Sequence, residues 1–229
     1  MTFTKTLLIL STLALAVSSR AASTEAAPES PEIKKAWQLQ EEILHRIQEP
    51  KFPKRDFLIT NFGAVGDGKT DCTDAIAKAI EACVQKGGGR VVVPEGQFLT
   101  GAIHLKSGVN LHLMTNSVLL FSTDPKKYLP AVFTRFEGTE LYNFSPLIYA
   151  LGQQNVAVTG EGTLDGQASE ENWLSWKSSS ARSKLVKMGT DNVPVEQRQF
   201  GEADHLRPSF VEFNRCANVL IEGVKIRRS

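Results

Sequence analysis

The sequence predicts an all-β fold, a right-handed parallel β-helix with N-terminal capping helices that is truncated at its C-terminal end. Two observations predict it. From Arg90 onward, short apolar strands are separated by tight turns of Gly, Asn and Ser, and the residue types repeat at a fixed offset. A unit of two or three short strands cannot bury its inward face alone, whereas stacked units bury it together.

The repeat is the stronger signal. A largely apolar quartet, a second quartet that begins with Asn, and a glycine occur twice, 63 residues apart. The two copies lie at 147–150, 155–158 and 160, and at 210–213, 218–221 and 223. A weaker copy lies 45 residues upstream of the first, around Ile103, Leu111 and Val118. A β-sandwich would also alternate apolar and polar residues, but it would not repeat residue types at a fixed offset.

Alternation within the repeat predicts which side chains fill the interior. The inward set on two successive coils is Ile148, Ala150, Val156 and Val158, followed by Val211, Phe213, Val219 and Ile221. Asn155 and Asn218 fall at the same turn of the two coils, so we expect their amides to stack as a ladder. The final coil is expected to be open at Ser229, as in the N-terminal part of a longer protein.

Residues 1–21 predict a secretory signal peptide. Lys5 precedes a short apolar run at 7–17, and small residues follow the run. The run has about 11 apolar residues, against the roughly 20 that span a bilayer. The mature protein is therefore expected to be secreted or periplasmic, without membrane association after signal cleavage.

Residues 22–55 predict a polar linker and an N-terminal amphipathic helix. Ser30 and Pro31 match a helix N-cap and a first helical position. Four apolar side chains follow at helical spacing: Ile33, Trp37, Leu44 and Ile47. This stripe is expected to cover part of a larger fold.

Residues 56–229 are assigned to the N-terminal coils of the β-helix. After a short strand and a Gly/Asp-rich turn, Asp71 is expected to cap a second helix that carries Ile76, Ala79, Ile80 and Cys83. Calcium is one interpretation of Asp67, Asp71 and Asp74, but turn and capping roles account for these residues more simply. No metal site is predicted.

Charge and cysteine content exclude several classes of protein. Lys and Arg number 26 against 25 Asp and Glu, which gives no reason to expect nucleic acid or anionic lipid as a partner. The odd set of Cys72, Cys83 and Cys216 leaves at least one free thiol, and no Cys/His spacing indicates a metal. We expect buried structural thiols, no cofactor and a monomer.

Several segments also carry a family resemblance. Residues 57–73 and 87–96 resemble the opening of pectin-degrading β-helix proteins. Five further segments resemble the polygalacturonase group of family 28 glycoside hydrolases; they are 134–138, 142–150, 160–167, 172–177 and 206–208. The resemblance implies a pectin-lyase-like solenoid. It also implies inverting hydrolysis of α-1,4-galacturonosyl linkages in pectin, either polygalacturonate or rhamnogalacturonan.

The family's catalytic motifs do not occur in this sequence. The family carries Asn-Thr-Asp, Asp-Asp, Gly-His-Gly and Arg-Ile-Lys, and none of the four is present. No catalytic residue is therefore predicted, and the 229 residues alone are expected to be inactive. Two alternatives stay open, a non-catalytic carbohydrate-binding β-helix module and a pectate-lyase-like protein.

Three residues are candidates for substrate binding. The resemblance places Arg207, with Ser209 and Glu212, on the active-site face, where its guanidinium would pair with a galacturonate carboxylate. Trp173 would stack on a sugar ring, as would Trp176, or else pin the inserted segment 168–207 to the barrel wall. The third is His205, otherwise an exposed loop histidine. Asp165 is expected to be a turn residue, and the strands that carry Glu212 and Glu222 give no assurance that the two share a cleft.

Overall fold

The computed structural model describes residues 30–229, so the predicted signal peptide lies outside the described residues. Residues 30–47 belong to one compact unit, and Gln48–Ser229 form another. Across residues 30–229, the helices are too short or too polar to span a bilayer.

The first helix, α1 (Pro31–Arg46), begins where its sequence predicts. The Ser30 hydroxyl accepts a hydrogen bond from the Ile33 N–H at 3.3 Å, and Pro31 opens the helix. The helix carries the predicted apolar stripe, and its role in covering part of a larger fold stays a prediction.

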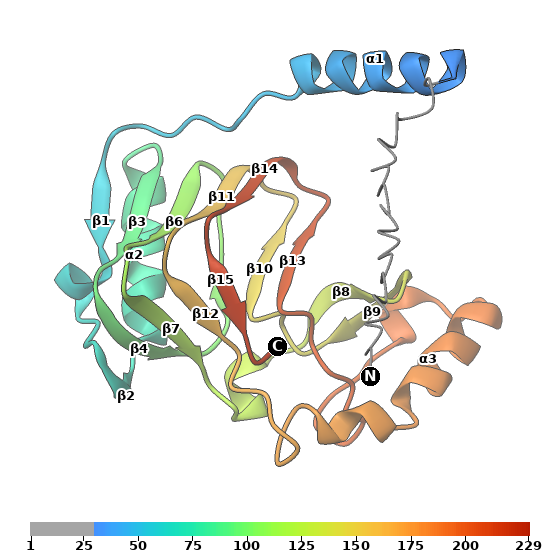
Figure 1. Cartoon of the computed structure of the whole chain (residues 1–229). Coiled ribbons are helices and arrows are strands. Elements are labelled where there is room, and N and C mark those ends of the chain that lie inside the picture. Colours follow the sequence, from blue (N-terminus) through green and yellow to red (C-terminus); the bar gives the residue numbers. More distant parts are fainter. Residues whose placement is uncertain (1–29) are drawn as a thin grey trace, which may run out of the picture. The chain divides into compact units, whose positions relative to one another are not determined.

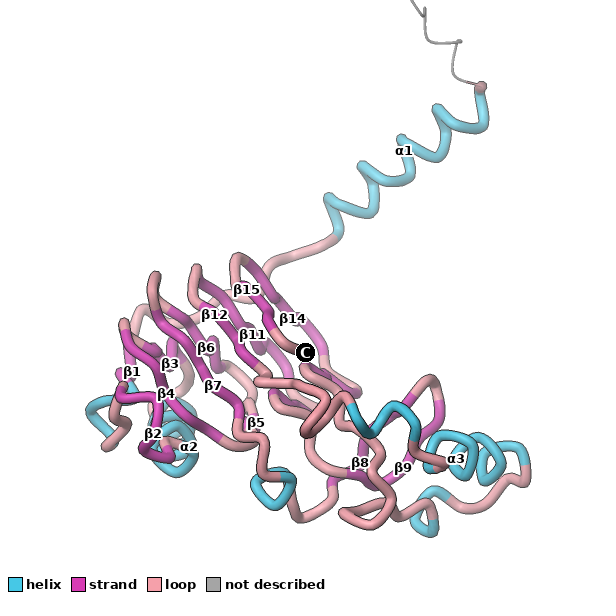
Figure 2. Tube along the Cα trace, turned by 60° about the horizontal axis from the view of Figure 1, so that its bottom comes forward, coloured by secondary structure: helices cyan, strands magenta, loops and turns pink. Residues whose placement is uncertain are grey.

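The second unit is a parallel β-helix of three sheets (Figure 1). The first sheet consists of β1 (Asp56–Leu58), β3 (Gly89–Val93), β6 (Val109–Leu113), β11 (Gln154–Gly160) and β14 (Ala217–Glu222). The second consists of β5 (Ile103–His104), β10 (Ile148–Leu151) and β13 (Val211–Asn214). The third consists of β2 (Asp67–Asp71), β4 (Gly96–Thr100), β7 (Ser117–Phe121), β12 (Thr163–Asp165) and β15 (Lys225–Arg227). The predicted fold class is confirmed, and Figure 2 shows successive coils stacked side by side.

Strand register confirms the 63-residue repeat. Ile148 pairs with Val211 on the second sheet, and Val156 pairs with Val219 on the first. The weaker repeat holds at 45 residues where Ile103 pairs with Ile148, but Leu111 pairs with Val158, an offset of 47. Because this slip is two residues, the inward side chains stay on the same face.

The predicted asparagine ladder is also present. The Asn218 Nδ2 donates to Asn155 Oδ1 at 3.1 Å. Both residues have positive φ, 54° and 53°, a conformation that asparagine tolerates better than most residues.

The helix α2 (Thr73–Gln85) packs against the first coils and buries the four side chains predicted for it. Cys72 occupies the N-cap position, and Asp71 accepts from the Thr73 N–H at 2.9 Å, so the side-chain cap comes one residue earlier than expected. All three cysteines are free: Cys72 and Cys83 are buried, and Cys216 is half-buried.

The interior is a continuous apolar column through the coils. In the first sheet Val91, Leu111 and Val158 lie in one row, and each is fully buried. The next residue in that row, Ile221, is 48% exposed. The predicted inward set is thus buried on the penultimate coil and open on the last one.

Two insertions form a second, smaller core. The antiparallel hairpin of β8 (Val132–Phe136) and β9 (Thr139–Asn143) packs with the helix α3 (Ala181–Thr190). Their buried residues are Leu141, Ala181, Leu185, Phe200 and Leu206. Short 3-10 helices complete the described elements; they are η1 (Ile59–Phe62), η2 (Pro125–Tyr128), η3 (Ser175–Ser178) and η4 (Val195–Gln197).

Candidate functional site

The outer face of the second sheet carries one row of polar side chains. Tyr149 pairs with His104 on one side and with Glu212 on the other. Its neighbours Ile148 and Ala150 are buried inside the coil. Because successive side chains of a strand point to opposite faces, the row His104–Tyr149–Glu212 lies on the outside of the β-helix.

The β8–β9 hairpin covers part of this row. The Tyr149 hydroxyl donates to the Phe133 carbonyl, and burial raises the pKa of Tyr149 to about 12. The Glu212 carboxylate accepts from the Thr134 hydroxyl and from the Arg135 N–H at 3.0 Å. Glu212 therefore lies on the face that the resemblance indicated, but its oxygens bind the hairpin.

The inserted segment after β12 borders the same region with aromatic side chains. Trp173 is only 6% exposed, and its ring packs edge-on against Tyr128 at 5.5 Å and Trp176 at 4.9 Å between centroids. These contacts fit the alternative stated for Trp173, in which it holds the insertion against the barrel, and its stacking on a sugar stays a prediction. Its indole N–H is buried and has no partner in the described structure.

The other two predicted residues lie close by. His205 is exposed, and its ring stacks on Trp176 at 4.9 Å between centroids. Arg207 is half-buried and lines a cavity of about 60 Å³ together with Trp173, Phe210 and Arg228. Within residues 30–229 the Arg207 guanidinium makes no hydrogen bond, so its fork is available to an anion.

Asp165 has the turn role that the sequence suggested, and it also binds Arg228. It ends β12, is 7% exposed, and accepts from Arg228 Nε and Nη2 at 2.7 and 2.6 Å and from the Gln167 N–H at 3.0 Å. Burial raises its pKa, but these hydrogen bonds outweigh burial and hold the pKa below its usual value. On this sheet Asp165 pairs with Arg227, an offset of 62 residues, so Arg228 lies one residue beyond the strand partner of Asp165.

No pair of carboxylates for hydrolysis forms on this face. Glu212 belongs to the second sheet and Glu222 to the first, so the two do not face one cleft. Asp67 accepts from Lys69 N, Thr70 N and the Thr70 hydroxyl, each at 2.8 Å, which is a turn role. In the part of the chain that the structure describes, no three acidic, His or Cys side chains are arranged to hold a metal ion.

Comparison with known proteins bears on this geometry. A hyperthermoactive exopolygalacturonase from Thermotoga maritima is 50% identical in sequence, with a TM-score of 0.82 over 85% of this chain and 46% of that one. The resemblance to family 28 glycoside hydrolases is confirmed. This polygalacturonase-like chain also matches the family model described as rhamnogalacturonase A/epimerase, pectate lyase-like, over residues 57–113.

Curated relatives agree with the structural neighbour. An exo-poly-α-D-galacturonosidase of Dickeya chrysanthemi is 36% identical over 116 residues, 47% of this chain and 19% of the relative. An exopolygalacturonase of Zea mays is 29% identical over 185 residues, 76% of this chain and 40% of the relative. The polygalacturonase-like chain thus spans less than half the length of these proteins.

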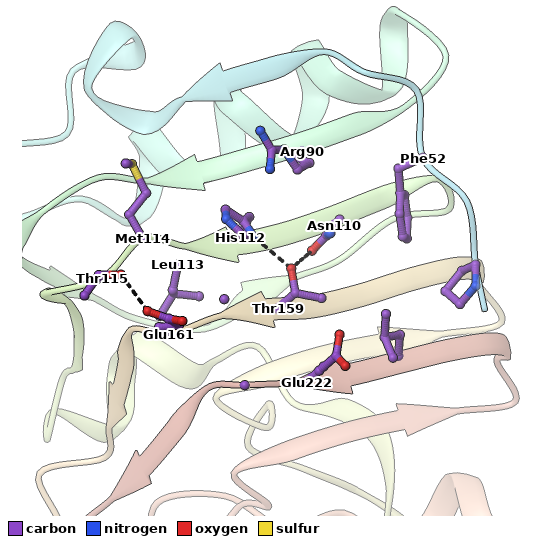
Figure 3. A pocket seen from close by; sticks show the side chains of 14 residues that line it. Phe52, Arg90, Asn110, His112, Leu113, Met114, Thr115, Thr159, Glu161 and Glu222 are labelled. Carbon is purple, nitrogen blue, oxygen red and sulfur yellow. Dashed lines mark hydrogen bonds between the residues drawn. The ribbon is translucent and has the colours of Figure 1, made fainter.

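Sequence reasoning missed a groove on the first sheet of the polygalacturonase-like chain. It has a volume of about 740 Å³, and Asn110, His112 and Thr159 contribute to its lining (Figure 3). In the segment 109–113 Asn110 and His112 alternate with buried Val and Leu. This alternation could have indicated a polar row on the outer face of the first sheet. This groove lies on a different sheet from Arg207 and the hairpin.

Proposed function

We propose that these residues are the N-terminal portion of an exported glycoside hydrolase that cleaves α-1,4-galacturonosyl linkages in pectin with inversion. The observation that carries the proposal is the 50% identity, over 85% of the chain, to an exopolygalacturonase of known structure. The chain spans less than half of its relatives, and we propose that the activity requires further coils.

The 229 residues alone are expected to bind but not to hydrolyse. Inverting hydrolysis needs one carboxylic acid to protonate the leaving oxygen and one carboxylate to activate water, about 6.5–9.5 Å apart. Glu212 on the candidate face is bound to the hairpin, and Asp165, which ends β12 on the third sheet, is bound to Arg228. Neither carboxylate is free to activate water.

Arg207 is proposed to recognise the carboxylate of a galacturonate unit. Its guanidinium is half-buried and free of hydrogen bonds among the described residues, and it borders a cavity. A planar guanidinium offers two parallel N–H groups to a carboxylate, which fixes orientation as well as charge. His205 is proposed to lie beside the substrate, on the Trp176 ring.

We further propose that cleavage proceeds from a chain end. The hairpin crosses the outer face of the second sheet and is held there by Tyr149 and Glu212. A polymer that lay along the stacked strands would meet this hairpin, whereas a chain end would stop against it. The names of the three relatives above describe exo-acting enzymes.

The test compares residues 22–229 with the protein encoded by the complete gene, each incubated with polygalacturonate. We expect no reducing sugar from residues 22–229, and monogalacturonate as the main product of the complete protein. Products of many lengths would contradict the exo proposal. Calcium-dependent, ultraviolet-absorbing products would indicate a lyase, and binding without cleavage by the complete protein would indicate a non-catalytic module.

Export is part of the proposal and has its own measurement. The apolar run at 7–17 and the small residues that follow it motivate the prediction of cleavage near Ala21. Mass spectrometry of the protein recovered outside the cytoplasm should show an N-terminus at about residue 22. A retained Met1 in that fraction would contradict the prediction. We also propose that the partner is a pectic polysaccharide and that the protein is a monomer.

A further inference from the structure

The groove on the first sheet, introduced above, is separate from the proposed substrate site. Strands β3, β6, β11 and β14 form its base, and Phe52 lies at one end (Figure 3). Its volume of about 740 Å³ exceeds that of the cavity beside Arg207 more than tenfold. None of its residues takes part in the function proposed above.

A chain of hydrogen bonds fixes the side chains at its base. The Thr159 hydroxyl donates to Asn110 Oδ1 at 2.9 Å, and His112 Nδ1 lies 2.9 Å from the Thr159 oxygen. Since the hydroxyl has a single proton, which it gives to Asn110, the Thr159 oxygen accepts from His112. His112 therefore carries its proton on Nδ1, and its Nε2 presents a lone pair.

Burial and the Arg90 charge lower the pKa of His112, against an opposing effect of Asp56. A lowered pKa favours the neutral form of the ring. With a neutral ring, Nε2 is an acceptor rather than a donor.

Two polar groups at the base of the groove have no protein partner. Asn110 is 7% exposed and Thr159 is 8% exposed, so the surrounding protein holds both side chains in place. Within residues 30–229, neither the Asn110 Nδ2 group nor His112 Nε2 makes a hydrogen bond. Both residues line the groove, and these two atoms are accessible to solvent, so the donor and the acceptor can bind a polar ligand there.

The charges around the groove select the kind of occupant. Arg90 is already bound to Asp56 through two hydrogen bonds of 2.8 and 2.7 Å. Glu161 and Glu222 remain as carboxylates on the lining, and Glu161 accepts from the Thr115 hydroxyl at 2.8 Å. The lining is therefore net negative and disfavours polygalacturonate.

We propose that this groove binds a neutral oligosaccharide. A sugar hydroxyl both donates and accepts, so it can satisfy Asn110 Nδ2, His112 Nε2 and the Glu222 carboxylate together. The Phe52 ring offers a flat apolar surface to the C–H groups of a sugar. The site would hold a neutral glycan independently of any hydrolysis at the second sheet.

The test is a titration of the 229-residue chain with two probes, β-1,4-galactotetraose and trigalacturonate, followed by amide NMR shifts. We expect galactotetraose to shift the amides of residues 110–113 and 159–161. Trigalacturonate should leave those amides unchanged. No shift with galactotetraose, or stronger shifts of these amides with trigalacturonate, would overturn the proposal.

Variants locate the binding. His112→Ala and Phe52→Ala should each weaken galactotetraose binding at least fivefold, and Glu222→Gln, which keeps shape and exposure, should weaken it by a smaller factor. Arg207→Ala is the matched control and should leave galactotetraose binding unchanged. If all three groove variants bind galactotetraose as well as the parent chain does, the assignment to this groove is wrong. A failure of trigalacturonate to bind anywhere would affect only the function proposed for the second sheet.

Discussion

Single side chains on this β-helix are fixed by contacts between coils. Arg228 holds Asp165 one coil away, and Asn218 holds Asn155. Arg207 differs from these, since it approaches a cavity without a hydrogen bond to the described residues. The Asp165 and Asn155 side chains already have hydrogen-bond partners among the described residues, whereas the Arg207 guanidinium has none there. A substrate carboxylate would supply that partner.

Replacing Arg207 should weaken the binding of trigalacturonate to the 229-residue chain. We expect Arg207→Ala to reduce affinity about tenfold or more, because a charge-assisted bidentate contact is lost. Arg207→Lys should recover only part of this, since an ammonium lacks the planar fork. Calorimetric titration measures both. Arg182→Ala on α3, whose partner is Glu137, is the control and should bind normally.

Asp67 gives a prediction about acid stability. Hydrogen bonds from Thr70 and Lys69 lower its pKa to about 2 from an ordinary value of 3.8. A carboxylate whose pKa is lowered on folding stabilises the native state above its ordinary pKa, and this contribution is lost as the pH falls through the lowered value. The stability difference between the parent chain and Asp67→Asn should therefore be constant above about pH 5 and shrink as the pH falls toward 2.

Urea unfolding at several pH values measures this difference. A gap between the parent chain and Asp67→Asn that stays the same from pH 5 to pH 2 would show that the Asp67 turn does not depend on its charge.

At the scale of elements, the hairpin and the corner turns are the parts with specific roles. The β8–β9 hairpin is tied to β10 and β13 by Tyr149 and Glu212. The corner between β11 and β12 requires Gly160, where φ is 108° and an added Cβ would lie 2.0 Å from the Leu113 carbonyl oxygen. The hairpin thus covers part of the candidate site, and the corner allows neighbouring coils to stack closely.

Gly160→Ala should destabilise the chain by about 1–3 kcal/mol or more, because both the backbone conformation and the close approach of the neighbouring coil disfavour a side chain. Gly201→Ala is the matched control, since no atom lies within 4 Å of its added Cβ. It should change stability by less than about 0.5 kcal/mol. Chemical unfolding compares the two, and equal effects would show that the corner tolerates Cβ.

Glu212→Ala should loosen the hairpin without unfolding the β-helix. The variant loses the acceptor of the Thr134 hydroxyl and the Arg135 N–H, so a protease should cut near Glu137 and Gly138 several times faster. Glu222→Ala removes an exposed glutamate from another sheet and should leave cleavage at the parent rate. If the two variants are cut equally, Glu212 does not hold the hairpin.

For the molecule as a whole, periodicity determined what the sequence could predict. The 63-residue repeat predicted the interior side chains, the Asn155–Asn218 ladder and the strand pairs of the first and second sheets, where each coil lies on its neighbour in that register. The two-residue slip between β6 and β11 was not visible, since both registers bury the same face.

The candidate site was less predictable because insertions build it. The hairpin, α3 and the segment around Trp173 depart from the repeat, and their contacts are tertiary and non-periodic. Composition alone could not show that Trp173 packs inward while Arg207 stays free. Alternation along the strands could have predicted that His104, Tyr149 and Glu212 lie on the outer face of the second sheet. It could not have predicted that the hairpin covers part of this row.

The stereochemistry of the first product tests the central claim most directly. The protein from the complete gene should act on polygalacturonate so that proton NMR shows β-galacturonate first, with the α-anomer appearing only by mutarotation, as inversion at an α-linkage requires. An initial α-anomer, or an unsaturated product in place of either anomer, would contradict the assignment to an inverting polygalacturonase.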